Sequence, residues 1–132
     1  MNNTKLQEDI ALVSAAKKVY LVGEYDWTAN NPDRSDLQSF FDIIEARQNT
    51  SNPVVAGDLF WSLFMHNVPD CNQYVNHSDG YALQYGNPAN TAENNTQISL
   101  IREHFFRMQN QTVGSYLPCV PCPGPTAEYT YL

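Results

Sequence analysis

The apolar residues of the chain form alternating helix-like and strand-like segments. Within residues 4–17, Leu6, Ile10 and Val13 recur at the spacing of one helical face, which predicts a short amphipathic helix. Residues 18–24 follow as a short, almost continuous apolar run. Such a run is typical of a parallel strand that is covered on both faces, because alternation is lost when neither face meets water.

A second helix and a second strand repeat this order. After a turn-forming segment at residues 30–33, Ser35 or Asp36 is suited to cap a helix. The helix is expected to end near Asn49, and a second apolar strand begins at Val54. One apolar stripe marks the face that the helix should bury: Leu37, Phe40, Phe41 and Ile44.

The rest of the chain is predicted to be a long loop, a third helix and a tail. Residues 65–90 show no sustained period, and loops longer than about 12–15 residues are usually functional or disordered. This one is too aromatic for disorder. Thr91 opens the third helix, and prolines and two cysteines after Thr112 argue against regular structure. The buried stripe of this helix is expected to be Ile98, Ile101, Phe105 and Met108.

The order of elements predicts an α/β fold. A right-handed β-α-β crossover makes the two strands parallel neighbours. Two parallel strands covered by helices on one side leave the other face and both edges of the sheet bare, which is a poor independent domain. We therefore expect residues 1–111 to be a segment of a larger α/β domain, and residues 112–132 to be an irregular tail rich in proline and cysteine.

Two residues suited to sugar chemistry follow the predicted strands. Glu24 ends the first strand, and Trp61 follows the second. The carboxyl ends of parallel strands build the active site of a (β/α)8 barrel. A carboxylate and an aromatic ring at neighbouring strand ends are therefore a candidate glycosidase half-site. Plainer interpretations stay open, since Glu after a strand is often a solvated loop residue and Trp there often belongs to the core.

The residues around both strand ends resemble those of family 5-type glycoside hydrolases, in particular the fungal mannanase-like members. Residues 22–27, Val-Gly-Glu-Tyr-Asp-Trp, are similar to the end of the seventh strand of these enzymes. Residues 57–64, Gly-Asp-Leu-Phe-Trp-Ser-Leu-Phe, are similar to the end of the eighth strand. The resemblance covers roughly residues 3–109. It implies that the chain is the C-terminal part, about the last two β/α units, of a (β/α)8 TIM barrel.

The same resemblance implies roles for both residues. In these enzymes the glutamate that ends the seventh strand is the catalytic nucleophile, and the tryptophan after the eighth strand lines the site of cleavage. Glu24 and Trp61 match those positions. The acid/base glutamate of the family comes from the fourth strand, which this chain lacks, and a complete barrel takes about 250 residues. We expect the 132-residue chain alone to be inactive, with the N-terminal part of the barrel missing.

The parent enzyme is expected to cleave a β-1,4-linked polysaccharide, most of all mannan, with retention of configuration. No cofactor and no metal is expected. The polysaccharide and the choice between endo and exo action stay open, because subsite contacts come from loops of the whole barrel. The alternative is a non-catalytic carbohydrate-binding protein or an inactive truncated hydrolase product, which would keep the aromatic residues without needing Glu24.

Other side chains near the strand ends are candidate substrate contacts. Tyr25 and Trp27 can extend the aromatic platform or pack against the adjacent helix. In the long loop, His66, His77 and Asp79 can contact sugar hydroxyls directly or form a hydrogen-bonded loop core. The pattern alone leaves these pairs of alternatives open.

The net charge excludes some classes of binding partner, and the glycosylation sequons bear on whether the protein is secreted. The formal net charge of −7 argues against nucleic acid and anionic membranes as partners, and no apolar run approaches the roughly 20 residues of a membrane span. The N-terminal residues have no apolar signal region. Asn-x-Ser/Thr sequons nevertheless favour a secreted parent protein over an intracellular one with chance sequons. They begin at Asn2, Asn49, Asn76, Asn94 and Asn110.

The three cysteines do not indicate a metal site or a redox site. They are too few for a four-cysteine zinc site. Cys119 and Cys122 have the spacing of a redox motif, but without a βαβ context a local disulfide is the simpler interpretation. Cys71 is then left over, and we expect its partner in the upstream region.

Overall fold

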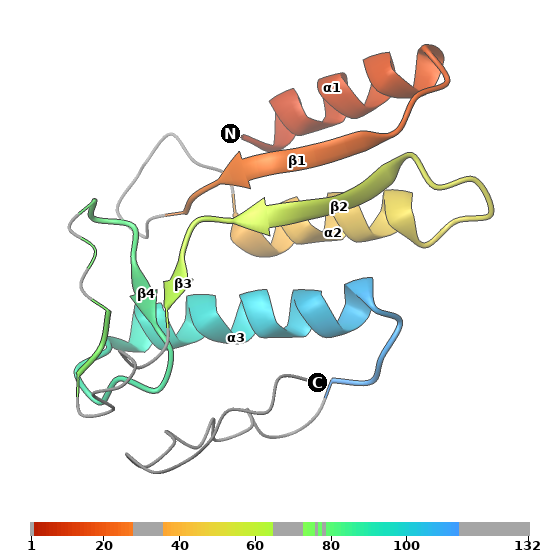
Figure 1. Cartoon of the computed structure of the whole chain (residues 1–132). Coiled ribbons are helices and arrows are strands. Elements are labelled where there is room, and N and C mark those ends of the chain that lie inside the picture. Colours follow the sequence, from red (N-terminus) through yellow and green to blue (C-terminus); the bar gives the residue numbers. More distant parts are fainter. Residues whose placement is uncertain (1, 28–35, 65–72, 76, 78, 114–132) are drawn as a thin grey trace, which may run out of the picture.

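The computed structural model describes residues 2–27, 36–64, 73–75, 77 and 79–113, and its helices and strands follow the predicted order with two short strands added (Figure 1). The elements are α1 Asn3–Ala15, β1 Tyr20–Tyr25, α2 Leu37–Gln48, β2 Val55–Phe60, β3 Leu63–Phe64, β4 Leu83–Gln84 and α3 Ala92–Met108.

The strands β1 and β2 are parallel neighbours, joined through α2 as a β-α-β unit. Both therefore end at the same edge of the sheet, as the two arrowheads in Figure 1 show. A backbone hydrogen bond closes the pair at each end. Tyr20 N–H donates to the Val54 carbonyl at 2.7 Å where the strands begin, and Trp61 N–H donates to the Tyr25 carbonyl at 2.7 Å where they end. The predicted parallel pairing is confirmed.

The core lies between the sheet and α2. Val22 and Val55 are buried on the helix-facing side of the strands, and the register shift after the Tyr20–Val55 pair separates Val55 from the face that carries Gly57. The N-cap of α2 is Asp36, whose side chain accepts from Ser39 N–H at 3.0 Å and satisfies one of the free amides of the first turn. All four residues of the predicted stripe are buried: Leu37, Phe40, Phe41 and Ile44.

The opposite face of this sheet is bare over the described residues. Leu21 and Leu59 are 56% and 58% exposed. They lie on the same face, because Leu21 pairs with Gly57 and its side chain lies 3.9 Å from the Cβ position of Gly57, which shares a face with Leu59. The sheet thus carries helices on one side and uncovered apolar side chains on the other.

The predicted loop, residues 65–90, contains the short strand β4 among its described residues. Two residues after β2 the chain forms β3, and β4 pairs with it in parallel. Leu83 N–H donates to the Ser62 carbonyl at 2.9 Å, and Tyr85 N–H donates to the Phe64 carbonyl at 2.8 Å. The expectation of a loop without strands was wrong here, because segments this short leave no readable period.

The helix α3 begins as predicted but buries a different face. Thr91 is its N-cap and forms a capping box with Asn94. Ile98 and Ile101 are buried, but Phe105 is 41% exposed, so the predicted stripe is wrong at that position. His104, with 0% exposure, takes its place.

None of the helices in the described part of the chain is both long and apolar enough to cross a membrane. Several residues considered above lie outside the described ranges, as does the tail from residue 114 onward. They are His66, Cys71, Asn76, Cys119 and Cys122.

Candidate active site at the ends of the parallel strands

Glu24 and Trp61 lie at the same edge of the sheet. Glu24 is the last residue but one of β1, and Trp61 follows β2 directly. The bond from Trp61 N–H to the carbonyl of Tyr25, the residue after Glu24, joins the two strand ends. Glu24 is exposed and Trp61 is 38% exposed, so both side chains are accessible. The predicted placement of this pair is confirmed.

The Trp61 indole is held by residues of the loop between β3 and β4. Its Nε1–H donates to Oδ2 of Asp79 at 2.6 Å. The His77 ring meets the indole edge-on, with 5.5 Å between centroids, and stacks on Phe64 at 5.7 Å. The Trp61–Ser62 peptide bond is cis. We call Trp61, Phe64, His77 and Asp79 the strand-end cluster.

Asp79 is the charged centre of the strand-end cluster. The hydrogen bond from the Trp61 indole lowers the pKa of Asp79 below its ordinary value of 3.8. The Tyr81 backbone N–H, which donates to Oδ1 at 2.9 Å, and the nearby His77 ring lower this pKa further. His77 Nδ1 lies 3.1 Å from Oδ2. Asp79 is therefore an ionised acceptor that fixes the direction of the indole ring.

This arrangement is suited to holding a polar ligand with an apolar face. A half-exposed indole offers a flat apolar surface with a polar rim, and the carboxylates of Glu24 and Asp79 can accept hydrogen bonds from hydroxyl groups. The structure places Glu24 and Trp61 at one edge of the sheet through β1 and β2, and it brings the Asp79 carboxylate to the Trp61 indole from the loop that follows β3.

Tyr25 and Trp27, predicted as possible platform residues, are buried instead. Tyr25 is 4% exposed and Trp27 is 6% exposed. Both rings pack on Phe40 of α2, with centroid distances of 4.9 Å and 5.1 Å. The β1 register shifts between Val22 and Tyr25, and this shift turns Tyr25 to the same side as Val22, which regular alternation would not do. The alternative of packing against the adjacent helix is therefore correct.

A buried polar network lies beneath this edge, and sequence reasoning missed it. The Tyr25 hydroxyl donates to Oδ1 of Asp58. His104 Nε2 lies 2.8 Å from Oδ2 of Asp58, and its Nδ1 lies 2.8 Å from Oε1 of Glu45. Arg107 Nε donates to both oxygens of Glu45, at 2.9 and 2.8 Å. We call Tyr25, Asp58, His104, Glu45 and Arg107 the buried network.

The His104 ring is held at both nitrogens and on one face. Each ring nitrogen lies 2.8 Å from a carboxylate oxygen. The ring also stacks flat on Phe41, with 4.0 Å between centroids and 7° between planes. Burial, and then the charge of Asp58, raise the pKa of Tyr25 well above its ordinary value of 10.0, so its hydroxyl stays a donor.

Arg107 closes the network on the solvent side. Burial by itself lowers the pKa of this guanidinium, but the hydrogen bonds and charge of Glu45, with a smaller contribution from Glu103, raise the pKa overall. Arg107 Nη1 lies 3.3 Å from Oε2 of Glu103. One sequence signal pointed to the network: His104 follows Ile101 at helical spacing, in line with the buried stripe of α3.

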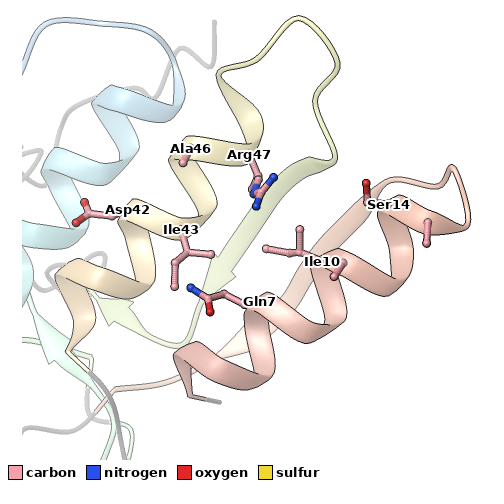
Figure 2. Close-up of a pocket in the computed structure, with 9 residues that line it drawn as sticks. Gln7, Ile10, Ser14, Asp42, Ile43, Ala46 and Arg47 are labelled. Atoms are coloured by element: carbon pink, nitrogen blue, oxygen red, sulfur yellow. The ribbon is translucent and has the colours of Figure 1, made fainter.

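A separate hollow lies on the outer side of the helices. It has a volume of about 880 Å³ and runs between α1 and α2. Figure 2 shows Gln7 and Ile10 of α1 facing Ile43 and Arg47 of α2 across it. No aromatic ring lines this hollow, and its one carboxylate, Asp42, accepts from the Gln38 amide at 2.7 Å. It offers nothing comparable to the strand-end cluster.

No group of three or more His, Cys, Asp or Glu side chains within the described ranges is placed to hold a metal ion. Comparison with models of known protein families, with curated proteins and with solved structures returned no match.

Proposed function

We propose that the chain carries the nucleophile edge of a retaining glycoside hydrolase of the family 5 type, acting on a β-1,4-linked polysaccharide such as mannan. One observation carries the proposal. A carboxylate and a half-exposed tryptophan lie at adjacent carboxyl ends of two parallel strands, joined by the backbone bond from Trp61 to Tyr25. In (β/α)8 enzymes this edge is where catalytic residues gather.

The bare face of the sheet supports a barrel. In a (β/α)8 barrel each strand presents one face to the helix layer and the other to the packed interior. Here the helix side of β1 and β2 is covered, whereas Leu21 and Leu59 on the opposite face are more than half exposed. We propose that these leucines belong to a barrel interior, and that the two β/α units are the last of eight in a secreted enzyme that uses no cofactor.

In the proposed mechanism this edge supplies the nucleophile and the aromatic platform, and another part of the barrel supplies the acid/base carboxyl. Glu24 attacks the anomeric carbon and forms a covalent glycosyl intermediate, while a protonated carboxyl about 5–5.5 Å away protonates the leaving oxygen. Trp61 stacks on the sugar ring, and Asp79 holds the indole and can accept from a hydroxyl group. The acid/base carboxyl comes from another part of the barrel.

The proposal is tested by expressing the protein that the complete reading frame encodes and measuring its turnover of β-mannan. The full protein should hydrolyse β-mannan, and proton NMR of the first product should show the β-anomer, as retention requires. Glu24→Ala should abolish turnover. The exposed Phe105→Ala is the matched control, because this side chain lies on α3 and lines a hollow beside Ala56 and Gly57, in the first half of β2. An inverted anomer, or normal activity of Glu24→Ala, contradicts the proposal.

A non-catalytic sugar-binding role is the second candidate. It is favoured by the strand-end cluster, in which aromatic and polar groups surround Trp61, while Glu24 is the one predicted catalytic carboxylate in the described ranges. The 132-residue chain alone should bind manno-oligosaccharides without cleaving them in either case. Binding that survives in the full protein with no turnover, and that Glu24→Gln leaves unchanged, supports this second role instead.

A further inference from the structure

We propose that Tyr25, Asp58 and His104 are positioning residues that fix the directions of Glu24 and Trp61. The catalytic benefit of this positioning rests on the function proposed above. Its structural content, which is that the buried network controls the geometry of the strand ends, can be tested without any substrate.

Tyr25 connects the buried network to the site through three bonds. It follows Glu24 in the chain, so the peptide plane between them sets the direction in which Glu24 leaves the strand. Its carbonyl accepts from Trp61 N–H at 2.7 Å. Its hydroxyl donates to Asp58. A rotation of the Tyr25 backbone therefore moves both candidate site residues at once, and the hydroxyl bond opposes that rotation.

His104 holds Asp58 in one arrangement. The imidazole is 0% exposed, lies 2.8 Å from carboxylates on two different elements and stacks on Phe41. The Asp58 side chain is 3% exposed, and its two oxygens are divided between His104 and the Tyr25 hydroxyl. With both oxygens engaged, the carboxylate has no alternative partner among these groups.

The charged residue types of the buried network also favour a role in fixing geometry over a role in stabilising the fold. Burying ions is costly, and apolar side chains of similar size often stabilise a core at least as well. Paired buried polar groups define one geometry, because each donor direction fixes the next acceptor, and the Tyr25 hydroxyl, both Asp58 oxygens and both His104 ring nitrogens are paired in this way. The charged groups around His104 are Asp58 on β2, Glu45 on α2, and Arg107 and Glu103 on its own helix.

Amide hydrogen exchange in the 132-residue chain separates positioning from stability. Trp61 N–H and Tyr20 N–H make backbone bonds of equal length, 2.7 Å, at opposite ends of the β1–β2 pair. Tyr25→Phe removes the hydroxyl and keeps the ring on Phe40. We expect exchange at Trp61 to accelerate about threefold to tenfold, the effect of one ordinary hydrogen bond, while exchange at Tyr20 stays within about twofold. Asp58→Asn should give the same pattern.

Gln48→Ala is the matched control. Gln48 Nε2 donates to the Met108 carbonyl at 3.1 Å, so this variant weakens the α2–α3 contact without removing a hydrogen bond of Tyr25 or Asp58. It should change exchange at Trp61 and Tyr20 by the same factor. Equal acceleration at both amides in Tyr25→Phe, or no acceleration at either, overturns the positioning role.

The result is independent of the proposed catalysis. If the full protein turns over mannan, Tyr25→Phe should lower kcat several-fold because Glu24 is less well aligned, and should raise KM about twofold or more because Trp61 stacks less firmly on the sugar. If the full protein shows no turnover but exchange at Trp61 still accelerates selectively, the proposed function fails and the positioning role stands.

Discussion

Two histidines of the chain pair with carboxylates in opposite surroundings. His104 is fully buried between Asp58 and Glu45, beneath the sheet, and stacks on Phe41. The His77 side chain is 43% exposed, lies 3.1 Å from Asp79 and stacks on Phe64. The residue types are the same, down to the aromatic ring under each imidazole.

The difference is access to water. In the buried network every ring nitrogen has a carboxylate partner, and removing one partner leaves a charge that water cannot reach. At the strand ends, water screens the pair and can replace either partner, which makes the pair weak but leaves its polar atoms open to a ligand. We infer that the first pair maintains the geometry of the site and that the second pair meets the substrate.

The largest effect is expected from His104→Ala. The substitution removes the central donor and leaves Asp58 and Glu45 facing a cavity beside Phe41. The free energy of unfolding should fall by about 3–5 kcal/mol, the usual cost of breaking a buried ion pair. Urea unfolding followed by circular dichroism measures this. A loss smaller than about 1 kcal/mol, within the range of ordinary substitutions, contradicts the assigned role of the buried network.

The next largest effect concerns binding at the exposed edge. Trp61→Ala should weaken binding of mannohexaose to the chain about tenfold or more, equivalent to the loss of ~1.4 kcal/mol of stacking. Isothermal titration calorimetry measures the dissociation constant. Phe105→Ala, which removes another exposed aromatic ring, should leave it unchanged. Equal affinity of the Trp61→Ala and wild-type chains contradicts the role of the indole as a platform.

The sequence predicts the placement of the strand-end residues but not the buried network. The α2 stripe and both caps, Asp36 and Thr91, follow from local spacing, and the placement of Glu24 and Trp61 follows from the β-α-β order. Local patterns carry this information because the elements themselves determine it.

The buried network depends on contacts that no local pattern contains. His104 meets Glu45 across 59 residues and Asp58 across 46 residues of sequence. A polar residue in line with an apolar stripe is assigned to the surface unless its partners are known, which is why Phe105 was predicted in its place. The inward direction of Tyr25 depends on a register shift, and alternation alone predicts the opposite side.

A smaller effect is expected from pH at the strand-end cluster. The folded pKa of Asp79 lies below 3.8, chiefly because the Trp61 indole donates to it, so the ionised cluster is fully formed above that value. Its contribution is lost as the pH falls through the lower, folded pKa. The Trp61 indole N–H resonance, followed by NMR from about pH 6 to pH 2, should therefore show a transition with its midpoint below pH 3.8. Asp79→Asn should remove this transition, and a midpoint above pH 3.8 for the transition that Asp79→Asn removes contradicts the assignment.

The smallest effect on folding is expected from His77→Ala, which is the counterpart of His104→Ala at the exposed edge. The free energy of unfolding should change by less than about 0.5 kcal/mol, as is usual for an exposed side chain. Mannohexaose binding should still weaken about threefold, because the ring lies edge-on against Trp61 at 5.5 Å and helps to hold the indole in place. Chemical denaturation and calorimetry on the same preparation measure both quantities. A stability loss as large as that of His104→Ala would show that access to water does not separate the two pairs. Unchanged binding would assign the orientation of the indole to Asp79 alone.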